Sequence, residues 1–274
     1  MAAFSPSDAA IEGFRVIGAR WRVVVGWSLF NLVMLIALFV AMVVLLVGTM
    51  PFAGTREAAS TLGAVIGAVI VGLGEVIVQV TLICGLMRLE LRPDEPAFLH
   101  LRIGRDELRV LGALLLLALV AALLAALLVG VILLGARASP ALAVLVGFVG
   151  AIGGYGVLLR LGLVSPIAFA ERRISLAESW RRTRGQFWSL VGMALLLLCF
   201  AALLAVIVWF ALFLLSGAAT GFSDLDLSGV EAMQAHPGRY VLQLAVQVLL
   251  APFWLVIGIA PWIAVYRALP AREA

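Results

Sequence analysis

Long apolar runs alternate with short arginine-bearing segments along the 274 residues of the chain. Six runs reach the roughly 20 apolar residues that a helix needs to cross a bilayer. The predicted spans cover residues 23–47, 61–87, 110–134, 141–165, 190–216 and 240–266. The pattern predicts an all-α fold, a polytopic membrane helix bundle of six transmembrane helices in a single integral membrane domain over residues 1–274.

A repeated unit groups these spans into three helical hairpins. One polar, arginine-bearing segment precedes each pair of spans, which predicts internal repeats at approximately 5–92, 93–173 and 174–268. Each segment begins with a helix-capping signal and continues with apolar residues at helical spacing. The capping signals are Ser5 with Pro6, Asp94 with Glu95 and Pro96, and Ser175 with Glu178. We therefore expect a cytoplasmic interfacial amphipathic helix before each hairpin.

Positive charge falls mainly on one side of the predicted membrane. All 19 basic residues are arginines, and the 15 acidic residues leave a net charge of +4. Fifteen arginines lie on one side of the six spans, and only Arg56, Arg137 and Arg239 lie on the other. Cytoplasmic segments of membrane proteins carry such an excess of basic residues. We therefore expect a multi-pass protein of the bacterial inner membrane with both termini in the cytoplasm.

The arginines of the three polar segments are candidates for contact with anionic lipid headgroups, because basic amphipathic helices bind such membranes. The candidates are Arg15, Arg22, Arg102, Arg105, Arg109, Arg181, Arg182 and Arg184. Anionic membrane lipids are the expected partners, and a protein partner at the same surface is the second interpretation of these charges. The sequence indicates no oligomeric state.

Two ionisable residues lie inside predicted spans, where a charge is costly. Glu75 is near the middle of the second span and Arg160 is in the inner half of the fourth. Their nearly equivalent positions in successive repeats suggest an ion pair that orders the bundle, with Gln79 as a third member. Two alternatives stay open: Arg160 extends its long stem to the headgroups, or Glu75 and Arg160 form a binding site within the membrane.

Glycines and prolines mark three of the spans. Gly63 and Gly67 form a GxxxG motif in the second span, and several glycines, Gly150 among them, crowd the fourth. Such residues allow neighbouring helices to approach closely. Pro252 and Pro261 each remove a backbone hydrogen bond from the last span, where they can kink the helix.

The residue patterns do not indicate catalysis, a metal or a cofactor. Cys84 and Cys199 lie inside apolar runs without CxxC or Cys/His spacing, and His100 and His236 are isolated on opposite sides of the predicted membrane. A nucleic-acid partner is not expected, because the chain has no basic face interleaved with aromatic residues outside its membrane-flanking segments. We expect a protein that is not an enzyme.

One stretch, residues 171–193 with the sequence ERRISLAESWRRTRGQFWSLVGM, carries a motif. The motif residues are Ser179, Trp180, Thr183, Arg184, Gly185 and Trp188. The stretch resembles the segment before the fifth span in the glycerophosphoryl diester phosphodiesterase membrane-domain family and in related uncharacterised six-span bacterial proteins. Arg182 stands where that family often has leucine. The resemblance implies a six-span membrane domain, and the soluble catalytic domain that gives the family its name has no counterpart in these residues.

These patterns together predict an integral inner-membrane protein, noncatalytic, that engages anionic lipid headgroups or a membrane partner. The alternative is a small transporter or lipid flippase that uses an intramembrane site of Glu75 and Arg160.

Overall fold

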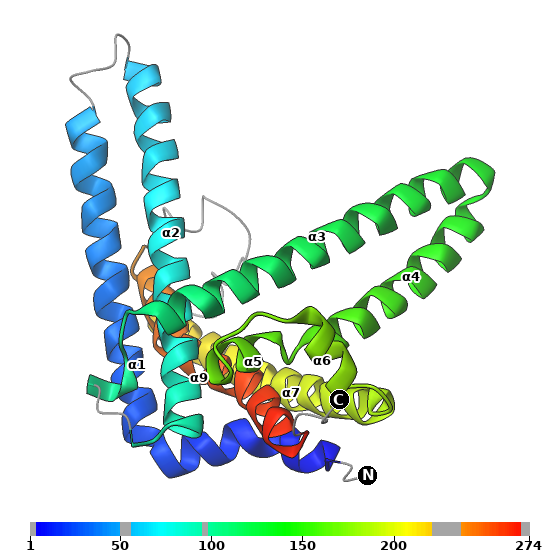
Figure 1. The fold of residues 1–274 in the computed structure, drawn as a ribbon. Coiled ribbons are helices and arrows are strands. Elements are labelled where there is room, and N and C mark those ends of the chain that lie inside the picture. Colours follow the sequence, from blue (N-terminus) through cyan, green and yellow to red (C-terminus); the bar gives the residue numbers. More distant parts are fainter. Residues whose placement is uncertain (1–3, 50–55, 95–97, 221–236, 270–274) are drawn as a thin grey trace. The chain divides into compact units, whose positions relative to one another are not determined.

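The computed structural model describes residues 4–49, 56–94, 98–220 and 237–269. Within these ranges all regular structure is helical. Six helices are long and apolar enough to cross a membrane (Figure 1). The predicted all-α, polytopic membrane fold is therefore confirmed.

Each predicted span lies in one of the six long helices, with one exception at a helix end. The helices are α1 (Pro6–Thr49), α2 (Arg56–Leu91), α3 (Arg105–Ala138), α4 (Pro140–Leu161), α7 (Phe187–Thr220) and α9 (Pro237–Ala268). The fourth predicted span continues past the end of α4 into the short helix α5 (Val164–Ala170). Between them, a Cβ at Gly162 would lie 2.3 Å from Trp262 Cζ3, so the ring packs against bare backbone.

The first and third predicted entry helices are present. The first is the beginning of α1, and Arg20, with φ −126° and ψ 28°, separates it from the rest of that helix. The third is α6 (Leu176–Arg182). It begins after Ser175, whose Oγ accepts a hydrogen bond from the Glu178 amide at 3.1 Å. This contact satisfies one of the free amides of the first turn, as the capping signal predicts.

The prediction of the second entry helix is wrong over the first half of that segment. Its capping residues Glu95 and Pro96 lie outside the described residues. Beyond them the chain forms only one 3-10 turn, η2 (Phe98–His100), and an α-helix begins at Arg105. Leu99 and His100 have φ values of 52° and 59°, in the left-handed region that interrupts a right-handed helix. The His100 carbonyl accepts a hydrogen bond from Arg88 Nη1 at 2.6 Å, a contact that local sequence does not reveal.

The described residues form two compact units. The first takes the described parts of Met1–Arg15, Cys84–Leu198 and Ile257–Ala274. The second takes those of Val16–Ile83 and Cys199–Val256. Each unit has buried residues of its own, and the charged residues that concern the function belong mainly to the first.

The core of the first unit lies among helix ends. Phe169 of α5, Met87 near the end of α2 and Leu190 near the start of α7 are fully buried. Ala113 of α3 packs in a cluster with Val164 of α5. The Ala113–Val164 contact packs α3 against α5, and it helps to fix the backbone from which charged side chains of this unit extend.

The middle of α3 presents an apolar stripe to its surroundings. Leu115, Leu119, Leu123 and Leu127 follow one another at intervals of four residues and are 56% to 65% exposed. Exposure of such a stripe to water costs free energy, whereas contact with lipid chains does not. The stripe therefore supports α3 as a helix that crosses the membrane.

Glycines allow close helix packing in both units. In the first unit, α3 and α4 form a hairpin (Figure 1), and a Cβ at Gly150 would lie 2.5 Å from Leu128 Cδ1. In the second unit, a Cβ at Gly67 of α2 would lie 2.7 Å from Met42 Cγ of α1. The close approach expected at these two glycines is confirmed.

Helix α9 remains a single helix across Pro252 and Pro261. Because proline has no N–H, the Val248 carbonyl, four residues before Pro252, lacks its helical donor. The buried side chain of Asn31 in α1 replaces that donor, and its Nδ2 lies 3.0 Å from the Val248 oxygen. A polar residue inside the first span is thus explained by a proline in the last.

Candidate functional site

Charged side chains of the first unit gather at the ends of its helices. They come from the last turn of α2, the first turn of α3, the segment after α5, helix α6 and the last turn of α9. Two clusters result. One surrounds an open pocket, and the other is closed by its own ion pairs.

A buried ion pair anchors the first cluster. Arg88 at the end of α2 is 2% exposed, and its Nη2 donates to Glu107 Oε1 of α3 at 2.6 Å. The Phe169 ring lies under the same guanidinium, 5.8 Å from ring centroid to Cζ. Removing one partner of such a pair leaves a buried charge and typically costs about 3 to 5 kcal/mol. The pair therefore fixes the start of α3 against the end of α2.

A second carboxylate of α3 holds two further arginines. Asp106 accepts hydrogen bonds from Arg109 Nη1 at 2.6 Å and from Arg92 Nη1 at 3.3 Å. Arg92 also donates through Nη2 to the Phe169 carbonyl at 3.0 Å, near the end of α5. Both acidic residues of the first turn of α3 are thus engaged by arginines, and their negative charge also complements the positive end of the helix dipole.

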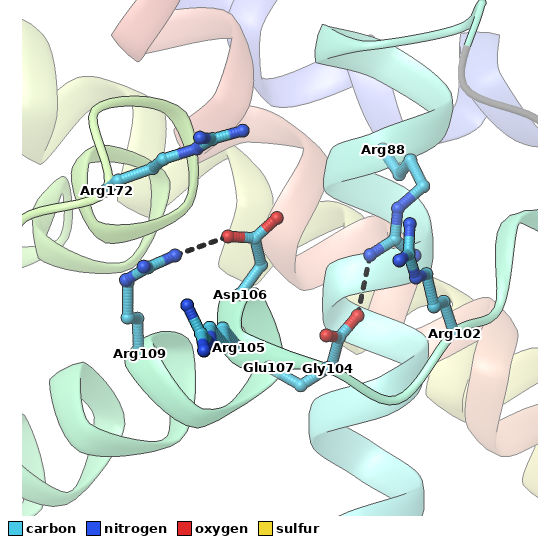
Figure 2. A pocket seen from close by; sticks show the side chains of 8 residues that line it. All are labelled: Arg88, Arg102, Gly104, Arg105, Asp106, Glu107, Arg109 and Arg172. Carbon is cyan, nitrogen blue, oxygen red and sulfur yellow. Dashed lines mark hydrogen bonds and ion pairs between the residues drawn. The ribbon is translucent and has the colours of Figure 1, made fainter.

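The pocket of this cluster, about 450 Å³ in volume, lies at the start of α3 (Figure 2). Its lining residues come from the end of α2, the start of α3 and the segment after α5. They are Arg88, Arg102, Gly104, Arg105, Asp106, Glu107, Arg109 and Arg172. Five arginines therefore face two carboxylates, and the excess of positive charge makes the pocket suited to an anion.

Three of the lining arginines form no ion pair with any described residue. These are Arg102, Arg105 and Arg172. The carboxylates of the pocket are already bonded to other arginines. A guanidinium that keeps its donors free can bind a carboxylate or a phosphate through two parallel hydrogen bonds. The three side chains are therefore the part of the pocket that is able to take an external anion.

The backbone near the pocket is unusual. Within the described residues, the non-glycine positions with positive φ are Leu99, His100 and Arg172, the last with φ 57°. Arg172 lines the pocket, and the His100 carbonyl binds Arg88, which also lines it. Such backbone costs about 1 to 3 kcal/mol per residue and is concentrated at functional sites.

The second cluster has a buried arginine at its centre. Arg182 Nε of α6 donates to Glu178 Oε1 at 2.7 Å, and its Nη2 donates to Glu171. Tyr266 of α9 donates its hydroxyl to Glu171 Oε1 at 3.3 Å. The prediction that Arg182 contacts lipid headgroups is corrected by this geometry, because its guanidinium lies inside the unit and is bound by two glutamates.

The arginines of this cluster keep its carboxylates ionised. The hydrogen bond from Arg182 holds the pKa of Glu178 below its usual value, although burial acts in the opposite direction. Burial raises the pKa of Glu171, but hydrogen bonds from Arg173 and Arg182 outweigh it and the pKa is lowered. Each of the two carboxylates in this cluster is therefore ionised and bound by more than one arginine.

The motif of residues 179–188 attaches α6 to the end of α4. Ser179 Oγ donates to the Arg160 carbonyl at 2.7 Å, and Thr183 Oγ1 lies 3.4 Å from the same oxygen. The ring of Trp180 lies beside the Arg160 guanidinium, with 4.6 Å between ring centroid and Cζ. These contacts satisfy a carbonyl in the last turn of α4 that has no helical donor.

Glycine and tryptophan complete the motif. Gly185 has φ 84°, which a side chain would make costly, and it turns the chain between α6 and α7. Trp188 at the start of α7 is 81% exposed, as expected of an aromatic anchor at the membrane surface. The motif thus has a structural role that requires its serine, threonine and glycine.

The two intramembrane candidates belong to different units, and each has neighbours in its own unit. In α2, Glu75 Oε1 accepts a hydrogen bond from Gln79 Nε2 at 2.6 Å. Arg160, in the last turn of α4, lies beside Trp180 and also beside Phe187, at 5.6 Å from that ring centroid. Gln79 is thus the described partner of Glu75, and the predicted pair of Glu75 with Arg160 stays a prediction.

The remaining headgroup candidates differ in how far they are neutralised. Arg15 is exposed and paired with Asp8 at 3.1 Å, and Arg181 is paired with Glu178. Arg22 is exposed beside the Trp21 ring, and Arg184 is exposed. Arg102, Arg105 and Arg109 line the pocket.

Sequence reasoning missed Arg172 and Arg88 as pocket residues. Arg172 belongs by position to the arginines that are predicted to be cytoplasmic, but its closeness to Arg105 depends on the packing of α5 against α3. Arg88 in the last turn of α2 and Glu107 in the first turn of α3 have complementary signs, and that is the one local signal for their pairing.

Comparisons with family models, with curated proteins and with solved structures find no match to this chain. Within the part of the chain that the structure describes, no group of three histidine, cysteine or acidic residues could hold a metal ion.

Proposed function

We propose that this integral membrane protein is a noncatalytic, multi-pass protein of the bacterial inner membrane that binds the headgroups of anionic lipids on its cytoplasmic side. The observation that carries the proposal is the arginine-lined pocket at the start of α3. Arg102, Arg105 and Arg172 bring positive charge there that the described carboxylates do not neutralise. A membrane partner with an acidic segment is the second interpretation of the same surface.

The position of the pocket along α3 supports a lipid headgroup as the ligand. Arg105 is the first residue of α3, and the apolar run begins five residues later at Val110. At 1.5 Å per residue, this separation is about 7.5 Å along the helix axis. The headgroup layer on each side of the hydrocarbon core is roughly 5 to 7 Å thick. An arginine at the start of α3 is therefore within reach of lipid phosphates.

The charge asymmetry of the chain supports the cytoplasmic placement of the pocket. The arginines that line it belong to the basic side of the six spans. The structural role of Ser179, Thr183 and Gly185 is compatible with the proposed relation to the phosphodiesterase membrane-domain family.

Lipid retention tests the proposal. Wild type is compared with a variant in which Arg102, Arg105 and Arg172 are all changed to glutamine, and native mass spectrometry measures bound phosphatidylglycerol relative to phosphatidylcholine at matched salt. We expect a loss of at least about tenfold, since hydrogen bonds to charged groups are worth about 1.5 to 3 kcal/mol each. Equal retention by both proteins, for phosphatidylglycerol and for phosphatidate alike, would show that the pocket does not bind anionic lipid.

A further inference from the structure

We propose that the pocket at the start of α3 is a specific site for a phosphomonoester, the terminal phosphate of a lipid such as phosphatidate or of a soluble phosphate compound. The proposal rests on the proposed function and names the ligand of the same site. A phosphodiester headgroup such as phosphatidylglycerol is the ligand that the site discriminates against.

The charge of the pocket matches a monoester. Its carboxylates are occupied, because Glu107 is paired with Arg88 and Asp106 with Arg109, both at 2.6 Å. The other lining arginines are Arg102, Arg105 and Arg172. A phosphomonoester carries about −1.5 to −2 charges near pH 7 and three strong acceptor oxygens. A diester carries a single charge and has two such oxygens, so it leaves part of this positive charge without a partner.

The same ion pairs hold the pocket in shape. The Arg88–Glu107 pair is buried and ties the start of α3 to the end of α2. Arg92 ties Asp106 to the Phe169 carbonyl near the end of α5, and the segment that carries Arg172 follows directly. The walls from three elements are thus fixed before a ligand binds, which lowers the entropy lost on binding.

Backbone amides add to the arginines. The N-cap residue of α3 is Gly104, which lines the pocket and provides no side-chain cap for the first turn. The uncapped amides at the start of a long helix attract an anion. Together with the guanidinium groups they offer donors from more than one direction, as the three oxygens of a terminal phosphate require.

The backbone conformation of Arg172 is a separate indication that the pocket is a functional site. Its φ of 57° lies in the left-handed region, which is unfavourable for a residue with a side chain. Its side chain reaches the pocket from the segment after α5, which is distant in sequence from the arginines of α3. The volume of about 450 Å³ is within the range of sites that bind small molecules or headgroups and is larger than a lone inorganic ion requires.

The test is a competition between lipids with identical acyl chains. The full chain in detergent micelles receives equal amounts of phosphatidate and phosphatidylglycerol, and native mass spectrometry gives the ratio of the bound lipids. We expect wild type to favour phosphatidate by about tenfold, the effect of one additional charged hydrogen bond. Arg105→Gln should bring the ratio close to one. The charge-matched control Arg137→Gln, at the far end of the same helix, should leave the ratio unchanged.

A second variant separates a specific site from general attraction. Arg172→Lys keeps the charge but loses the planar guanidinium that forms paired hydrogen bonds. Arg172 is exposed, and thermal unfolding of the variant would reveal any folding defect. A reduced phosphatidate preference in this variant supports the site. A preference that persists undiminished in both Arg105→Gln and Arg172→Lys overturns it.

The outcomes also identify the source of the phosphate. Displacement of phosphatidate by glycerol 3-phosphate supports a site that binds the phosphate of either compound. Retention of phosphatidate in the presence of glycerol 3-phosphate supports a site that requires the lipid. Equal binding of phosphatidate and phosphatidylglycerol, both above phosphatidylcholine, overturns the monoester site but leaves the proposed function standing. Binding of neither above phosphatidylcholine overturns both.

Discussion

Arg182 and Glu178 are one helical turn apart in α6, and both are buried. A glutamate four residues before an arginine is the spacing that favours an ion pair on a helix, so the sequence contains a signal for this contact. It contains none for Glu171 or Tyr266, which complete the cluster from other segments. Charge sign and membrane position alone therefore predict a headgroup contact for a side chain that lies in the interior.

Arg182→Leu introduces the residue that the resembling family often has at this position. We expect it to destabilise the first unit by about 3 kcal/mol, because the buried carboxylate of Glu178 loses its strongest partner. Adding Glu178→Gln should recover part of this loss. Thermal unfolding in detergent measures the effect, with the exposed Arg184→Leu as control. An unchanged midpoint for Arg182→Leu would show that the cluster does not stabilise the fold.

The pH dependence of the same cluster follows from its carboxylates. The pKa of Glu178 is lowered by its hydrogen bond from Arg182, so the stabilisation is present above the pKa of the unfolded glutamate and is lost as pH falls through the folded value. Wild type should therefore lose stability on acidification below about pH 4.3 more steeply than Arg182→Leu/Glu178→Gln.

At the scale of the elements, the apolar runs predict the six long helices because only their length and composition matter for crossing a bilayer. The entry segments are less predictable, since their ends depend on contacts with distant residues. The turn at Leu99 and His100 is bound by Arg88 of the preceding helix, so the segment is not the helix that its apolar spacing indicates. The break after α4 depends in the same way on the ring of Trp262 against Gly162.

The contact between α1 and α9 allows a sharp test of one element. Asn31→Leu removes the donor that serves the Val248 carbonyl, and a buried carbonyl without a partner costs about 1 to 3 kcal/mol. Pro252→Ala restores the helical N–H for the same oxygen. Asn31→Leu should therefore lower the thermal midpoint in wild type and lower it much less in the Pro252→Ala background. Equal effects in both backgrounds would show that the proline is not the reason for the buried asparagine.

At the scale of the whole molecule, the sequence predicts the excess of arginine on one side of the six spans but not which of these arginines meet. Ion pairs neutralise Arg15, Arg181 and Arg182, and packing gathers Arg102 and Arg105 with Arg172 around the pocket. The functional candidates thus form a small subset of the basic residues, selected by the position of a few carboxylates. Net charge therefore predicts contact with an anionic surface, while the carboxylates determine which of the described arginines are left without an ion pair.

Substitution of Glu75 distinguishes the hypothesis of a lipid-binding protein from that of a transporter. The Glu75 carboxylate accepts a hydrogen bond from Gln79 one turn away in the same span, which lowers the cost of a polar side chain there without any transported species. We therefore expect Glu75→Gln to leave the retention of anionic lipid at the arginine pocket unchanged. Proteoliposomes assayed for proton flux and for transfer of a fluorescent lipid between leaflets should show no pH-dependent activity that this substitution removes. If wild type shows such an activity and Glu75→Gln abolishes it, while Arg105→Gln does not, the intramembrane carboxylate is the functional site. The pocket of α3 would then be a means of attachment to the membrane surface.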